Sequence, residues 1–211
     1  MRKVLLLLIT GILIIGGLAG CTRPVPAEPT TVPADYFPVG INNRWDYSGE
    51  GNEYAAYVWE MPYVKDNQAQ SYINNGGVVG TDIFRIDDNA ITRVFFVGEE
   101  VFFVEEEYEQ KNMLENGFTS NDHTVILKSP IKKGTVWENA NETREIVAID
   151  TRVKTPAGDF SDCLQIKITH ADSTIVFEYY AAGVGLVKRE SICDNFRVTS
   201  ILQEYSLVSG Q

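Results

Sequence analysis

Polar and apolar residues alternate most clearly in the second half of the chain. Leu164, Ile166 and Ile168 fall on one side of an extended segment, and the residues between them are polar or charged. Because successive side chains of a strand point to opposite faces, this spacing predicts a strand with one face in water. Similar β-rich runs, separated by turn residues, recur along the chain. The predicted strands are residues 54–59, 83–86, 91–97, 101–106, 124–127, 145–154, 163–169, 174–180, 186–192 and 197–207.

The strand expected at residues 145–154 repeats the alternation. Val147, Ile149 and Val153 are placed on its apolar face and Ile146 on the opposite one. No segment has sustained helical periodicity, and the best helix candidate, residues 105–114, could equally be a strand end and its loop. The predicted fold class is therefore mainly β, with antiparallel meanders forming a strongly curved sheet, an open barrel or a sandwich.

A repeated proline–tryptophan spacing suggests that the domain consists of two similar halves. Pro38 and Trp45 are seven positions apart, as are Pro130 and Trp137, and each pair precedes a run of predicted strands. The spacing indicates either two meanders of about 90 residues each or a coincidence, and both interpretations stay open.

Residues 94–104 depart from simple alternation. Two apolar runs flank the polar residues 98–100, which predicts a hairpin with a turn at its centre. Phe95 and Phe96 would point to opposite faces, and Phe102 and Phe103 would repeat this in the second strand. Bare apolar faces promote aggregation, so a second layer of the domain, an apolar ligand or a partner must cover them. These four phenylalanines are the candidate ligand or partner face.

The amino-terminal residues have the order of a secretory signal. Arg2 and Lys3 precede an apolar run that ends in Leu18-Ala19-Gly20-Cys21. This ending resembles the lipobox of bacterial lipoprotein signal peptides. The resemblance implies cleavage before Cys21, transfer of a diacylglycerol to its thiol, and anchoring on the outer face of a bacterial membrane. The alternative is an uncleaved membrane helix, although a span needs about 20 apolar residues and a cysteine there would have no use.

A proline-rich segment follows the lipobox. Residues 22–34 contain four of the eight prolines, which favours an extended tether that holds a domain away from the bilayer. A proline-motif ligand for a recognition domain is the alternative. The predicted organisation is a signal peptide at 1–20, the lipidated cysteine and tether at 21–35, and one β domain at 36–211.

The charge balance excludes several partners. The full chain has 18 basic and 29 acidic residues and a net charge of −11. Removal of Arg2 and Lys3 with the signal leaves about −13. Such a chain repels nucleic acid and anionic lipid headgroups, so neither is an expected partner.

Catalytic and metal-binding patterns are absent from the sequence. His123 and His170 have neither metal-ligand nor triad spacing. The acidic groups Asp82, Asp87 and Asp88 and residues 105–109 are interpreted as a solvated face, with a calcium site or a hydrolytic carboxylate pair as the alternative. No catalytic residue, metal or cofactor is predicted.

Cys163 and Cys193 are expected to be free thiols. In a meander their strands are next-nearest neighbours, about 9–10 Å apart, whereas a disulfide needs Cα atoms within about 7 Å.

A set of short motifs resembles poorly characterised envelope lipoproteins of bacteria. They are Tyr36-Phe37-Pro38, Trp45-Asp46-Tyr47, Trp137, residues 155–160 with Cys163, Tyr179-Tyr180-Ala181, and residues 183–188. The resemblance covers most of residues 36–190 and implies no catalytic residues. The fold of this family is similar in outline to curved antiparallel sheets such as the lipoprotein-localisation-factor fold. This resemblance implies a hydrophobic concavity.

These observations favour a lipid-anchored envelope protein with a non-catalytic binding or accessory role. Its expected partners are the membrane, through Cys21, and either an envelope protein or an apolar small molecule. One alternative is a carrier of lipid or another hydrophobic ligand, with a cavity behind residues 94–104. The other is a carboxylate-based hydrolase.

Overall fold

The computed structural model describes residues 31–100, 111–193 and 196–208. The signal peptide, Cys21, Phe102 and Phe103 lie outside these residues. Twelve strands form the domain, together with a 3-10 helix η1 (Pro33–Tyr36) and a short helix α1 (Met113–Asn116). The strands are β1 (Asn43–Glu50), β2 (Tyr57–Lys65), β3 (Gln68–Asn74), β4 (Val79–Asp87), β5 (Ala90–Glu100), β6 (Thr124–Lys128), β7 (Val136–Glu138), β8 (Glu142–Thr155), β9 (Gly158–His170), β10 (Ile175–Ala181), β11 (Gly185–Cys193) and β12 (Phe196–Ser206). No helix among the described residues has the length and apolar character of a membrane span.

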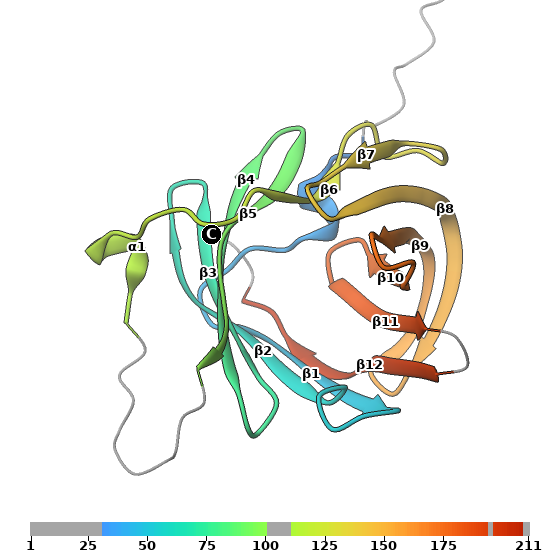
Figure 1. Ribbon diagram of the computed structural model, residues 1–211, viewed down its shortest axis with the longest axis horizontal. Coiled ribbons are helices and arrows are strands. Elements are labelled where there is room, and N and C mark those ends of the chain that lie inside the picture. Colours follow the sequence, from blue (N-terminus) through green and yellow to red (C-terminus); the bar gives the residue numbers. More distant parts are fainter. Residues whose placement is uncertain (1–30, 101–110, 194–195, 209–211) are drawn as a thin grey trace, which may run out of the picture. The chain divides into compact units, whose positions relative to one another are not determined.

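All twelve strands belong to one antiparallel sheet with the order β6-β5-β4-β3-β2-β1-β12-β11-β10-β9-β8-β7. Strands β1–β6 form one meander, β7–β12 form another, and the β1–β12 pair joins them. The sheet curls into a nearly closed, barrel-shaped wall (Figure 1). The predicted fold class, antiparallel meanders in a strongly curved sheet, is confirmed.

The spaced tryptophans occupy equivalent places in the two meanders. Trp45 lies in β1 and Trp137 in β7, the first strand of each half. The Trp45 indole N–H donates to the Val184 carbonyl at 2.7 Å, and the Trp137 indole N–H donates to the Val125 carbonyl at 2.8 Å. Each indole therefore binds the backbone of the other half, which supports the two-halves interpretation.

The predicted faces are right for β9 but only partly right for β8, where Val153 is buried as predicted. Leu164, Ile166 and Ile168 are all buried. In β8, however, Ile146 is fully buried and Ile149 is 42% exposed. The pairing of β8 with β9 shifts register three times between Ile146 and Val153. These irregularities exchange the inward and outward residues, so a strict alternation does not run through the strand.

The turn predicted at residues 98–100, in the middle of the expected 94–104 hairpin, is wrong. Strand β5 continues through residues 98–100, where Glu100 pairs with Val79 of β4. Gly98 lies next to the exposed Phe96 ring, which is 2.8 Å from the position of a Cβ atom at this glycine. The partners of β5 in the described chain are β4 and β6.

Three of the described strands, β1, β3 and β7, were not predicted, and in β3 the buried polar residues Gln70 and Ser71 interrupt the apolar pattern. Gln70 in β3 is fully buried, and its side chain donates to the Lys111 carbonyl and accepts from the Met113 N–H. The segment that begins at Lys111 thus covers β3, and Phe118 of this segment packs edge-on against Phe95 at 5.8 Å. A layer of the same domain therefore covers Phe95. Of the helix expected at 105–114, the described part shows only the first residues of α1, capped by Asn112.

Both described cysteines are free, as predicted. Strand β10 lies between β9, which carries Cys163, and β11, which carries Cys193. Cys163 is buried, and burial raises the pKa of its thiol to about 11, whereas Cys193 is exposed.

Candidate ligand-binding cavity

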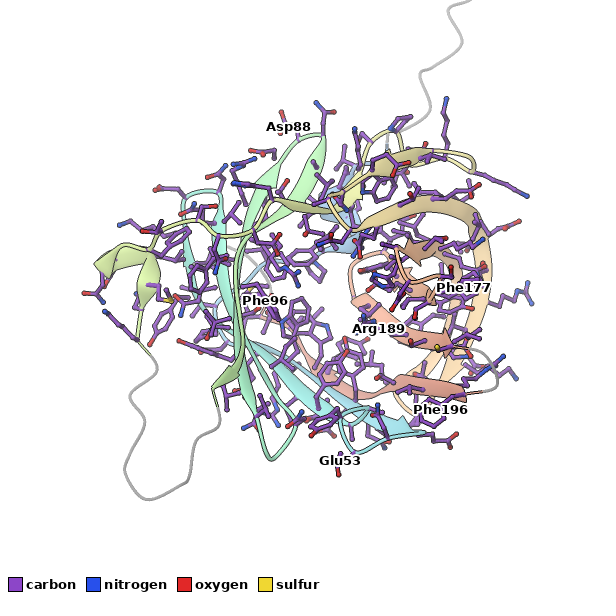
Figure 2. All side chains as sticks on the ribbon, in the orientation of Figure 1. Glu53, Asp88, Phe96, Phe177, Arg189 and Phe196 are labelled. Atoms are coloured by element: carbon purple, nitrogen blue, oxygen red, sulfur yellow. The ribbon has the colours of Figure 1, made fainter. Side chains whose placement is uncertain are left out.

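A cavity of about 690 Å³ lies on the inner face of the curved sheet, between the two meanders. Its volume is within the range of about 300–1,000 Å³ typical of small-molecule sites. Figure 2 shows Phe96 on β5 and Arg189 on β11 on facing walls of the sheet. The lining combines aromatic side chains with two clusters of charged ones.

Aromatic side chains from the first meander form one wall. Phe37 lies 4.9 Å from Phe84 and 5.6 Å from Trp59, measured between ring centroids. Trp59 is 9% exposed, and its indole N–H has no hydrogen-bond partner in the described part of the chain. Buried polar groups are normally hydrogen-bonded, so an unpaired donor on a cavity wall is unusual.

The first charged cluster joins β4, β5 and the residues before β6. Arg93 Nε lies 2.5 Å from Asp122 Oδ2, and Arg93 Nη1 lies 3.5 Å from Asp82 Oδ1. Burial raises the pKa of Asp82 to about 6, against the attraction of Arg93. Hydrogen bonds from Thr124 and Arg93 outweigh burial at Asp122 and lower the pKa of that carboxyl. The Arg93 guanidinium therefore contacts both carboxylates, but the pKa of Asp122 is lowered whereas the pKa of Asp82 stays raised.

The second cluster lies in the second meander and is centred on Arg144. Its guanidinium contacts Glu142 at 2.5 Å and Glu178 at 3.2 Å, and it also donates to the Ile126 carbonyl. Glu178 accepts from the Tyr180 hydroxyl at 2.8 Å and lies 3.6 Å from Arg189 Nε. These cations and the hydroxyl keep the pKa of Glu178 below its usual value although the side chain is buried.

Side chains close the gap between the two edge strands at this cavity. Strands β6 and β7 end the sheet and do not pair with each other. The Asn139 amide pairs with both backbone groups of Val125, accepting from its N–H at 2.9 Å and donating to its carbonyl at 3.2 Å. Asn121 pairs with Phe96 in the same way. An amide side chain thus takes the place of a neighbouring strand at two free edges.

Of the four phenylalanines predicted to form a ligand or partner face, only Phe96 is seen near the cavity in the described part of the chain. Phe95 points to the opposite, covered face, whereas Phe96 lies beside a cavity residue, with the Arg93 guanidinium 4.4 Å above its ring. Phe102 and Phe103 lie outside the described residues. The solvated-face interpretation holds for Asp88, which is exposed, and fails for Asp82, which is 3% exposed.

Apart from Asp82, the charged residues of the cavity were not predicted from the sequence. Glu178 is in phase with the buried Val176 and Tyr180 of β10, and this charged position among apolar ones was the available signal. His123 and His170 both line the cavity, which their spacing did not indicate.

Several of the short motifs singled out in the sequence contact each other across the fold. The Tyr47 hydroxyl donates to the Leu186 carbonyl at 2.8 Å, as the Trp45 indole does to Val184. Gly185, at φ +96°, lies where a Cβ atom would come within 3.3 Å of Pro38. The first motifs of the domain and residues 183–188 thus contact each other, and their role is structural.

Comparisons with known proteins leave the family open. No protein-family profile and no curated protein matches the chain. Two solved structures are similar to it. One is described as an exported protein with a YmcC-like fold from Bacteroides fragilis, with 14% identity, a TM-score of 0.46, and coverage of 82% of this chain and 99% of that one. The other is described as a lipoprotein from Parabacteroides distasonis, with 15% identity, a TM-score of 0.46, and coverage of 85% and 100%. Similarity at this level carries no information about ligand or activity.

Proposed function

We propose that this protein is a lipid-anchored protein of the bacterial envelope that binds a small ligand in its inner cavity without catalysing a reaction. The lipobox ending at Cys21 supports the anchor. The observation that supports binding is the cavity of about 690 Å³, which has an aromatic wall, an unpaired buried indole N–H and two charged clusters.

The lining disfavours a carrier of long acyl chains. An alkyl chain in this cavity would cover Asp82, Arg144 and Glu178 with apolar surface and cut them off from water without offering hydrogen bonds. A mixed polar and aromatic lining suits a ligand that has both apolar faces and hydrogen-bonding groups. The ligand is therefore an amphipathic small molecule.

The cavity carboxylates also suit binding better than hydrolysis. Asp82 and Asp122 have pKa values displaced in opposite directions, as in acid–base pairs. Arg93, however, contacts both carboxylates and occupies the position between them that a scissile bond would need.

Native mass spectrometry of the full-length protein, purified from membranes, tests the proposal. We expect a bound mass in the wild type. Ala140 lines the cavity and is exposed, so Ala140→Trp should fill the site without removing a core contact and should abolish the bound mass. Ala182→Trp, at an exposed turn position away from the lining, is the matched control and should retain it. No bound mass in the wild type, or equal retention in Ala140→Trp, would refute the proposal.

A further inference from the structure

We infer that the ligand is neutral and rich in hydroxyl groups, as a saccharide is, and that it contacts both the aromatic wall and the charged clusters of the cavity. This inference rests on the proposed binding function and narrows it to one chemical class.

Each of the four carboxylates and three guanidiniums that line the cavity already has an ion-pair partner. Asp82 and Asp122 contact Arg93, and Glu142 and Glu178 contact Arg144. The remaining lining guanidinium, Arg189, lies 3.6 Å from Glu178. A charged ligand would have to compete with one of these buried pairs for its partner, and disturbing a buried ion pair is costly. A neutral ligand avoids this cost.

The charged residues of the cavity can still offer a ligand both hydrogen-bond donors and hydrogen-bond acceptors. Arg189 has a half-exposed side chain (47%) and makes one long contact through Nε, which leaves its terminal N–H groups available as donors. The second oxygen of Glu142 lies 3.5 Å from His170 Nδ1 and is an acceptor on the same wall. A hydroxyl group both donates and accepts, so several hydroxyls on one molecule match a wall of alternating donors and acceptors.

The aromatic wall supplies the apolar contact that such a ligand needs. Phe37, Trp59 and Phe84 pack against one another and line the cavity together with the charged residues of the second meander. The carbon-bound hydrogens of a sugar ring form apolar patches that pack on aromatic faces, while its hydroxyls point outward. The two kinds of wall therefore match the two kinds of surface on a sugar.

The test is binding of the full-length protein to an array of neutral and anionic glycans, followed by isothermal titration with the strongest neutral glycan. The protein is kept in lauryldimethylamine oxide, a detergent without a sugar headgroup. We expect a neutral glycan to bind and Arg189→Gln to weaken its binding about tenfold, since hydrogen bonds from a charged donor would be lost. Arg197→Gln is the matched control. This arginine lies on the opposite face of the sheet with one contact of 3.4 Å to Glu190, and its loss should leave affinity unchanged.

Each negative outcome separates this inference from the proposed function. If native mass spectrometry finds a bound mass that Ala140→Trp removes, but no neutral glycan binds, the saccharide class is wrong and the binding function stands. Glycan binding that Arg189→Gln leaves unchanged places the sugar elsewhere and also overturns the inference. Absence of any bound mass and of any glycan binding overturns both.

Discussion

Replacing Asp82 by asparagine should stabilise the protein more at pH 8 than at pH 4.5. Asp82 has a folded-state pKa of about 6, above the value of 3.8 expected in the unfolded chain. Between these two values the folded state binds more protons than the unfolded state, so the free energy of unfolding falls as the pH rises. Above pH 6 the folded protein carries the full cost of a buried carboxylate that has one contact at 3.5 Å.

The size of the effect follows from the displacement of the pKa. A shift of about two units corresponds to about 3 kcal/mol over the whole titration, of which about 2 kcal/mol falls between pH 4.5 and 8. An asparagine amide also needs hydrogen bonds, and this constant cost is the same at both pH values. The difference in unfolding free energy between variant and wild type should therefore move by about 2 kcal/mol in favour of Asp82→Asn between pH 4.5 and 8.

Urea unfolding of both proteins at the two pH values measures this difference. Asp122→Asn is the control, because Asp122 contacts the same Arg93 but has a lowered pKa. Its ionised form contributes stability that is present above the unfolded-state pKa and lost in acid. The control should therefore destabilise the protein more at pH 8 than at low pH. A pH-independent effect of Asp82→Asn, or the same sign for both variants, would refute this account of the cluster.

Three further predictions concern the gap between β6 and β7, the two described cysteines and the lipid anchor. Asn139→Ala removes two hydrogen bonds to Val125 and should lower the free energy of unfolding by about 2 kcal/mol in urea titrations; no loss would mean that the edges close without it. In the folded protein a thiol reagent at pH 8 should modify Cys193 and not Cys163, and unfolding should expose the second group; prompt reaction of both would contradict the burial of Cys163. Cys21→Ser should abolish incorporation of radiolabelled fatty acid and release the protein from membranes, and equal retention without label in either form would exclude the anchor.

The fold class was predictable because hydrophobic alternation reports directly on strands. In β9 the pattern of Leu164, Ile166 and Ile168 persists through the strand, and the structure follows it. In β8 the same reasoning was only partly right, because register shifts against β9 depend on a partner strand that no local pattern describes. The predicted turn after Val97 failed because β5 continues to Glu100, which pairs with Val79 of β4.

The candidate site was much less predictable than the fold. Glu178 could have been recognised as a charge in an apolar phase, but its partner Arg144 lies 34 positions away, and only the strand order brings them together. The expectation of a hydrophobic concavity was half right. Aromatic residues line one side, and long-range ion pairs that sequence spacing does not reveal line the other.

The most direct test of ligand binding is the indole N–H spectrum of the full-length protein. The sequence has three tryptophans, so three indole resonances are expected, assigned by Trp→Phe substitution. Trp45 and Trp137 donate to backbone carbonyls, whereas Trp59 lies on the cavity wall without a partner. The spectrum is recorded as isolated and again after unfolding in guanidinium and refolding, which strips a bound molecule. Cavity binding predicts that the Trp59 resonance moves on stripping while the Trp45 resonance stays. Identical spectra, or movement of Trp45 alone, would contradict it.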